Sequence, residues 1–118
     1  MKTGPIGLWL MLLAVAGIGQ LAVYGQAGAE TEDARMARGK KLFVKYCAGC
    51  HGAGGDGGGY KLLGSDPANL TSPSMKKKSG SALLKTIHEG TSNMPPWKVR
   101  LSEQDSRAVL AYIRTLSK

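Results

Sequence analysis

The chain has 118 residues, a length that allows one small domain and excludes a multidomain enzyme. Lys and Arg number 16 against 8 Asp and Glu, so the net charge is +8. No nucleic-acid-binding motif accompanies this excess, which therefore indicates a solvated surface or steering toward an acidic partner.

Residues 1–29 are predicted to form an export signal peptide. Lys2 gives the positive start, Ile6 to Val23 is almost wholly apolar, and Ala27-Gly28-Ala29 is a small-x-small cleavage site. The mature domain would then be residues 30–118. The alternative is an uncleaved membrane anchor, because the apolar stretch approaches the ~20 residues that span a bilayer. Both interpretations place the folded domain outside the cytoplasm.

Residues 33–46 are predicted to form a helix that leads into the cysteine-containing segment. Met36, Gly39, Phe43 and Tyr46 recur at spacings of three and four residues. A glycine inside a helix costs about 1 kcal/mol relative to alanine. Gly39 therefore suggests that another backbone crosses this helix closely.

Residues 47–51 read Cys-Ala-Gly-Cys-His, the C-x-x-C-H attachment site of a c-type haem. Cysteines three residues apart lie on one side of a helical turn, so each can form a thioether to one haem vinyl group. His51 follows directly and is placed to ligate the iron. Cys47 and Cys50 are the only cysteines, so none is left for a disulfide.

Cysteines and histidines also serve two other kinds of site. A structural zinc site needs four ligands, and the chain offers only Cys47, Cys50, His51 and His88, with no second pair at finger-like spacing. A thioredoxin-like redox pair needs a βαβ setting, and no strand is predicted nearby. Haem is therefore the favoured interpretation.

The segment after the motif is predicted to be irregular. Residues 52–59 contain six glycines, which excludes a helix, and no G-K-[ST] follows to make a phosphate loop. Residues 61–74 continue as loop, with Pro67 and Pro73 as breakers. Lys76 to Lys78 is predicted to be an exposed basic run.

Two further helices complete an all-α chain. The first spans residues 81–89, with Ser79 or Ser81 as its cap and Gly90 as its end. Residues 91–100 form a loop. The last helix begins at Ser102, and its sequence carries a capping-box pattern (Ser102-x-x-Asp105) and an apolar face of Val109, Tyr112, Ile113 and Leu116.

Three downstream residues are candidates for the second axial ligand of the iron. Met94 is favoured, because Pro95 and Pro96 stiffen the backbone beside it and a thioether raises the reduction potential. The alternative for Met94 is gap-filling in the core. His88, near a helix end, is expected to be a solvated surface residue, and Met75 is expected on a mobile loop.

The sequence resembles a class I cytochrome c of the small bacterial periplasmic kind, over about residues 34–116. The resemblance is carried by Gly39-Lys40-Lys41-Leu42-Phe43 before the haem motif, Pro67-Ala68-Asn69-Leu70, Gly90-Thr91-Ser92-Asn93-Met94-Pro95-Pro96-Trp97, Leu101-Ser102 and Val109-Leu110-Ala111-Tyr112-Ile113. It implies the cytochrome c fold, with three to four short helices and loops wrapped around one covalently attached haem c.

The resemblance also implies specific site residues. Cys47 and Cys50 would form the thioethers, and His51 and Met94 would be the two axial ligands. The first and last helices would cross near-perpendicularly, with Gly39 and Phe43 against Val109 and Tyr112.

One departure from the family pattern concerns the acceptor for the second nitrogen of His51. Many relatives place a proline shortly after the motif and use its carbonyl, whereas this chain has Gly55-Asp56-Gly57-Gly58-Gly59-Tyr60. A carbonyl of this stretch is expected to take that role. Candidate propionate partners, each equally able to be ordinary packing or surface, are Tyr60, Asn69, Trp97 and Arg100.

The functional prediction is a mono-haem electron carrier in the periplasm that serves redox partners with acidic docking surfaces. It is not expected to be an enzyme, because no carboxylate pair or serine–histidine arrangement is visible. One alternative is a dedicated haem subunit docked permanently to an oxidoreductase complex. Another is a haem sensor or enzyme with a labile methionine.

Overall fold

The computed structural model describes residues 28–117 of the chain, so the predicted signal peptide lies outside the described residues except for its last two. The elements are helices and one short 3-10 turn, and apart from an isolated bridge between Thr91 and Met94 no strand pairing occurs in this part. The all-α prediction is therefore confirmed. The elements are α1 (Glu32–Tyr46), α2 (Ala48–His51), η1 (Leu62–Gly64), α3 (Pro73–Lys77), α4 (Gly80–Glu89) and α5 (Glu103–Leu116).

Polar side chains fix the starts of the longer helices. The Ala82 amide of α4 donates to the Ser79 hydroxyl at 3.2 Å, which decides between the two predicted caps. The predicted capping box of α5 is present. The Asp105 amide donates to the Ser102 hydroxyl at 3.1 Å, and the Ser102 amide donates to the Asp105 carboxylate at 3.3 Å. Each such cap satisfies helix-end amides that have no intrahelical partner.

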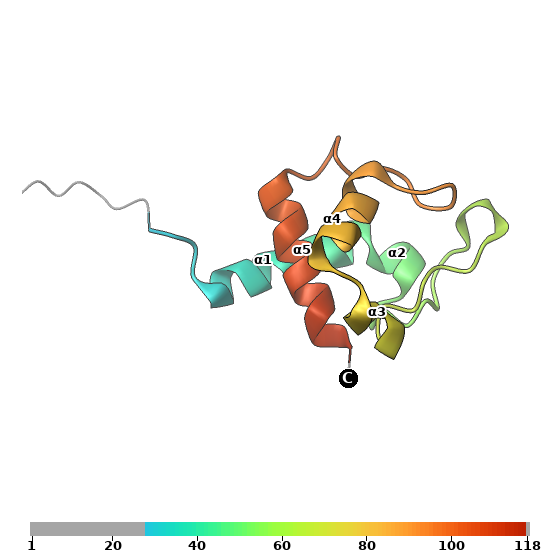
Figure 1. Ribbon diagram of the computed structural model, residues 1–118, viewed down its shortest axis with the longest axis horizontal. Helices are drawn as coiled ribbons and strands as arrows, with labels where there is room; N and C mark the ends of the chain where they lie inside the picture. The colour runs from blue at the N-terminus through green and yellow to red at the C-terminus, as the bar shows by residue number, and fades with distance from the viewer. Residues whose placement is uncertain (1–27, 118) are drawn as a thin grey trace, which may run out of the picture.

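The centre of the fold is the crossing of the first and last helices, α1 and α5 (Figure 1). Phe43 and Val109 are both fully buried there, and the Phe43 ring lies 5.3 Å from that of Tyr112, measured between centroids. A Cβ on Gly39 would fall on the carbonyl oxygen of Ala108 and 3.2 Å from the Cβ of Tyr112. The close crossing predicted from Gly39 is confirmed, with Ala108 rather than Val109 as its nearest contact.

His88 joins α4 to α5, so the expectation of a solvated surface histidine is wrong. Its Nε2 lies 2.7 Å from the hydroxyl of Ser106, which is 0% exposed. The last turn of α4 packs against the first turns of α5 (Figure 1), and this brings the two side chains together. Sequence reasoning missed this serine–histidine contact. Because Ser106 is sealed from solvent, the pair is a packing contact and no substrate reaches it.

Residues 73–77 form a helix, α3, where the sequence analysis expected irregular chain and a mobile loop. Pro73 occupies one of the first two helical positions, where its missing N–H costs nothing. Met75 is only 8% exposed, while Lys76 and Lys77 are exposed as predicted. The prediction that Met75 lies on a mobile loop is therefore wrong.

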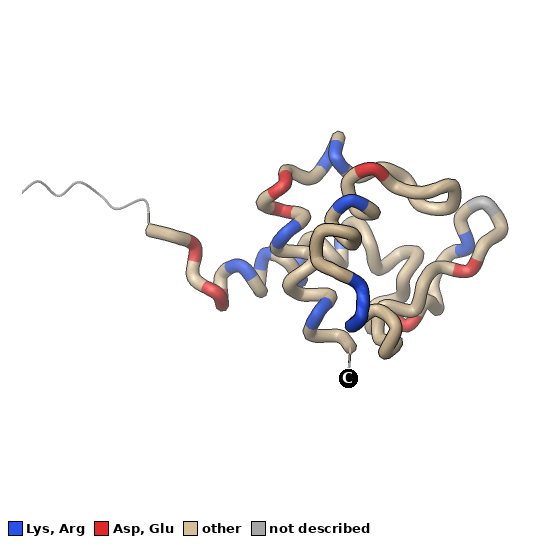
Figure 2. Tube along the Cα trace, viewed as in Figure 1, with Lys and Arg blue, Asp and Glu red and all other residues tan. Residues whose placement is uncertain are grey.

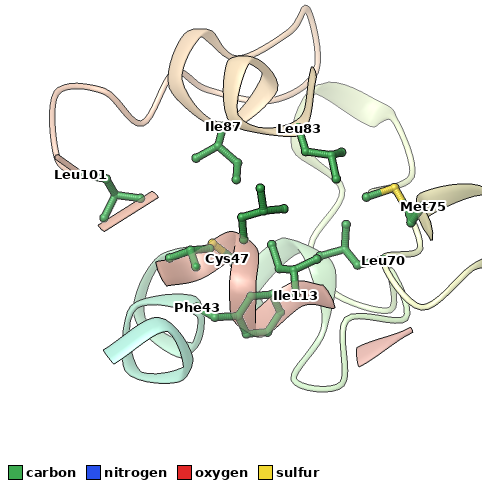
Figure 3. Packing of buried hydrophobic residues seen from close by; sticks show 10 residues of the cluster. Phe43, Cys47, Leu70, Met75, Leu83, Ile87, Leu101 and Ile113 are labelled. Atoms are coloured by element: carbon green, nitrogen blue, oxygen red, sulfur yellow. The ribbon is translucent and has the colours of Figure 1, made fainter. Parts of the chain in front are cut away.

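The buried side chains surround a common interior space (Figure 3). Leu83 and Ile87 of α4 lie on one side of it, with Cys47 and Ile113 opposite and Leu70 and Met75 at one end. Among the described helices, none combines the length and the apolar character that crossing a bilayer requires.

Candidate haem site

The cysteines and the adjacent histidine sit on a short helical turn directly after α1. The Cys47 amide donates to the Phe43 carbonyl at 2.8 Å, and the His51 amide donates to the Cys47 carbonyl at 2.9 Å. This turn places Cys47, Cys50 and His51 on the wall of one cavity of about 340 Å³. The volume lies within the range of sites that hold small molecules and cofactors.

The environment of Cys47 keeps its sulfur uncharged. Cys47 is 7% exposed, and burial, with a smaller contribution from the nearby Cys50 sulfur, raises the pKa of Cys47 to about 11. At neutral pH this group is therefore a thiol rather than a thiolate, and thiolate is the form that binds metal ions or attacks disulfides. Within residues 28–117, no three His, Cys, Asp or Glu side chains gather into a possible metal site.

His51 is oriented by a backbone carbonyl, but not by the one expected. Its Nδ1 lies 2.9 Å from the carbonyl oxygen of Ala68. A carbonyl only accepts, so Nδ1 carries the proton and Nε2 keeps its lone pair for a metal. The expectation that a carbonyl of residues 55–60 takes this role is wrong.

Two backbone hydrogen bonds explain why the acceptor comes from so far along the chain. The Gly57 amide donates to the His51 carbonyl at 2.8 Å, and the Leu70 amide donates to the Gly55 carbonyl at 2.7 Å. The glycine-rich loop thus doubles back and lays residues 67–70 beside the histidine. Pro67 directly precedes the acceptor, but the carbonyl that accepts belongs to Ala68 and not to the proline.

Met94 is on the wall of the same cavity, held by a tight loop after α4. The Thr91 amide donates to the Met94 carbonyl at 2.8 Å, and the Trp97 amide donates to the Ile87 carbonyl at 3.0 Å. Gly90 has a φ of +70°, and a Cβ there would lie 2.7 Å from the nitrogen of Pro96. The two prolines therefore pack over Gly90 and hold the loop against α4.

The two rival candidates for the second axial ligand differ in their position relative to the cavity. His88 does not line the cavity, whereas Met75 does. Sequence reasoning missed Met75 as a cavity residue. The signal that could have found it is Ser72-Pro73, a serine followed by proline, which is typical of a helix start.

Only one of the four candidate propionate partners lies on the cavity wall. Trp97 does, and its ring lies 5.4 Å from that of Tyr46, a second aromatic wall residue that sequence reasoning did not consider. Tyr60 is 80% exposed. The Asn69 side chain accepts from the amide and hydroxyl of Thr71, and Arg100 is exposed away from the wall.

The cavity wall fits a haem. Apolar side chains from α4 and α5 suit the porphyrin, the two cysteine sulfurs suit its vinyl groups, and an imidazole nitrogen with a free lone pair suits its iron. The apolar wall residues of these helices are Leu83, Ile87, Leu110 and Ile113.

Comparison with known proteins agrees with this chemistry. A family model described as "Cytochrome C oxidase, cbb3-type, subunit III" matches residues 34–113. The chain is 37% identical over 82 residues to the cbb3-type cytochrome c oxidase subunit FixP of Bradyrhizobium diazoefficiens. This match covers 68% of the chain and 27% of FixP. The chain is also 32% identical over 88 residues to cytochrome c6 of Cladophora glomerata. That match covers 66% of the chain and 85% of cytochrome c6.

A solved structure shows the same fold. The structure titled "KustC0563 c-type cytochrome" matches with a TM-score of 0.58 and 27% identity, covering 68% of this chain and 98% of that one. Fold, cavity and relatives thus define the class: a class I c-type cytochrome, an electron-transfer protein whose cofactor is haem c.

Within this class, the chain belongs to the family of cbb3-type cytochrome c oxidase subunit III. It spans about a quarter of the length of FixP and 32% of CcoP of Rhodobacter capsulatus.

Proposed function

We propose that this domain carries single electrons through one haem c, attached at Cys47 and Cys50, with His51 and Met94 as axial ligands of the iron. The observation that carries the proposal is that all four side chains line one cavity. When bound, the haem supplies an iron that accepts and returns one electron, and histidine–methionine ligation raises its reduction potential.

The chain's own groups prepare this chemistry. His51 donates from Nδ1 to the Ala68 carbonyl, which fixes its tautomer and its ring orientation. Met94 presents a neutral, soft sulfur from a loop anchored at the Ile87 carbonyl through Trp97. Leu83, Ile87 and other apolar wall residues exclude water, and this favours the less charged ferrous state.

With both axial positions filled, no substrate can bind the iron, so the domain itself would not be an enzyme. The absorption spectrum of the purified holoprotein tests this ligand set. We expect a sharp reduced α-band and a weak far-red sulfur-to-iron band in the ferric form, and we expect Met94→Ala to lose the far-red band. Met75→Leu is the matched control, because Met75 also lines the cavity.

Two outcomes would contradict the ligand set. Loss of the far-red band in Met75→Leu, with the band kept in Met94→Ala, would place the ligand on α3. A high-spin spectrum of the parent protein that shifts with carbon monoxide would mean an open iron, and sensing or catalysis would then replace electron carriage.

Exposed lysines next to the cavity support an acidic redox partner. Figure 2 shows a positively charged stretch where α3 leads into α4. Lys76, Lys77 and Lys78 are exposed, and Lys78 also lines the cavity. Charges of this kind raise association rates with an acidic surface, and salt screens the effect. The second-order rate of electron exchange with an acidic redox protein should therefore fall steeply as salt is raised.

A dedicated subunit of an oxidase complex is the second candidate function. The observation in its favour is the similarity to FixP and CcoP, both named as cbb3-type oxidase subunits. Purification of the tagged protein from its own membranes separates the two. A salt-resistant complex of fixed stoichiometry would indicate a subunit, and recovery of the cytochrome alone would indicate a shuttle.

We further propose that residues 1–29 act as a signal peptide and that the domain of residues 30–118 works in the periplasm, with an uncleaved anchor as the alternative. Glu30, the first residue of the proposed mature chain, pairs with Arg38 of α1 at 2.5 Å. The intact mass of the purified protein tests the boundary. A mass that corresponds to residues 30–118 plus one covalent haem is expected, and a mass that retains the leader would indicate the anchor.

A further inference from the structure

One arginine of α5 reaches across to α3. Arg114 donates from Nη1 to the Met75 carbonyl at 2.7 Å and from Nη2 to the Lys78 carbonyl at 2.6 Å. A longer contact of 3.4 Å joins Nη1 to the Lys76 carbonyl. A single guanidinium therefore binds the carbonyls at the end of α3 from a helix almost forty residues further along the chain.

α3 needs such an attachment from outside. It has only five residues, too few to be stable as an isolated helix. Its last carbonyls have no partner within the helix, and the Lys78 backbone after it is extended. The principal helix contacts of the fold join α1, α2, α4 and α5 and leave α3 out. Hydrogen bonds between Ser72 and Asn69 anchor the start of α3, and the buried Met75 side chain and Arg114 hold the rest of it.

The two residues that Arg114 binds most closely, one in α3 and one directly after it, are wall residues of the haem cavity. Met75 and Lys78 both line it, and Figure 3 shows Met75 between Leu70 and Leu83 at one end of the buried cluster. If α3 moved outward, this end of the cavity would open to water.

The charges around Arg114 show that the hydrogen bonds must be specific. Arg114 binds a segment that carries three consecutive lysines, Lys76, Lys77 and Lys78, and these like charges give an arginine no attraction. The carbonyl ends of a helix attract one, and the guanidinium fork can bind two carbonyls at fixed geometry. A lysine ammonium carries all its donors on one nitrogen, so it cannot bind two carbonyls with this fixed geometry.

We propose that Arg114 is a positioning residue of the haem site: it holds α3 in place, and through α3 it keeps Met75 against the haem and water away from it. This rests on the proposed function only in that a haem occupies the cavity. Loss of Arg114 would admit water beside the iron, stabilise the ferric state and lower the reduction potential.

The test compares Arg114→Gln with Lys77→Gln in the intact holoprotein. Both remove one positive charge near the cavity, but only the first removes donors to the α3 carbonyls, because the glutamine amide ends short of the Nη atoms. Amide hydrogen exchange of α3 should become about tenfold faster in Arg114→Gln, as expected for the loss of charged hydrogen bonds. Its reduction potential should fall further than that of Lys77→Gln.

Two more variants separate positioning from charge and from general destabilisation. Arg114→Lys keeps the charge and loses the fork, so its α3 exchange should also be accelerated. Met75→Ala should lower the reduction potential. Adding Arg114→Gln to Met75→Ala should lower the potential by less than Arg114→Gln does alone, because both substitutions affect the same end of the cavity wall.

Several results would overturn the proposal: unchanged α3 exchange in Arg114→Gln, parental behaviour of Arg114→Lys, or full additivity with Met75→Ala. These results leave the far-red band of the parent protein untouched. Failure of the proposed ligand set, by contrast, would appear in the spectrum of the parent protein itself, so the two failures are distinguishable.

Discussion

Replacing Gly39 by alanine sets two opposing free-energy changes against each other in α1. Alanine is the better helix former by about 1 kcal/mol, which would stabilise the protein. The new Cβ, however, would fall on the carbonyl oxygen of Ala108 and 2.7 Å from its carbon. The obstacle is backbone of the facing helix and cannot rotate away as a side chain would.

We expect the steric cost of the new Cβ to exceed the gain in helix propensity. Forcing an extra carbon into a close-packed contact typically costs about 1–3 kcal/mol, and the rigid obstacle places Gly39→Ala at the upper end. The crossing also buries Phe43 and Val109 completely, so any separation of the helices loosens their packing as well. We expect a net loss of about 2 kcal/mol, equivalent to a fall in Tm of about 10 °C for a domain of this size.

Thermal unfolding of the holoprotein, followed by far-UV circular dichroism, measures this effect. Gly80→Ala is the matched control, because Gly80 is also helical and a Cβ there would meet only the Leu110 side chain, at an ordinary 3.8 Å. Gly80→Ala should leave Tm unchanged or raise it slightly. A raised Tm in Gly39→Ala would refute the reasoning, since helix propensity would then outweigh the backbone contact.

Three further predictions follow from the packing, the cap and the methionine loop. Phe43→Ala should lower the free energy of unfolding by about 3–5 kcal/mol in denaturant titrations, because the ring is 0% exposed, and a loss below 1 kcal/mol would contradict its place in the core. The Ser102 hydroxyl, and secondarily the Arg38 guanidinium, hold the pKa of Asp105 below its usual value. Its stabilisation is therefore present at neutral pH and is lost as pH falls from about 4 through the lowered pKa, so Asp105→Asn should be less stable than the parent at pH 7 and nearly equal to it in strong acid. Gly90→Ala should weaken the far-red band, because φ is +70° and the new Cβ would strike Pro96, whereas an unaltered band would mean that the loop does not depend on this glycine.

Local signals in the sequence predicted what depends on local physics. Ser102 and Asp105 are three residues apart and cap the last helix with their own side chains, so the sequence contains both partners. Gly39 was informative for the opposite reason. A residue that weakens its own helix predicts a close neighbour, and α5 lies there.

Contacts between distant segments explain what the sequence did not predict. The acceptor for His51 is 17 residues away, at Ala68, and is a backbone carbonyl that any residue could supply. α3 was missed because its lysines indicate solvent exposure, while the arginine that stabilises it lies on the last helix. His88 looked like a surface residue because its partner, Ser106, belongs to another element. Pattern within one segment cannot reveal such pairs.

The crossing of α1 and α5 also determines when the domain can fold. It joins the first long helix of the domain to α5, so the complete burial of Phe43 requires α5. Contacts so distant in sequence slow folding. If the proposed signal peptide exports the chain, that delay would suit a polypeptide that crosses a membrane before it folds. Because the core depends on α5, a premature stop ahead of α5 would abolish the structure rather than shorten it.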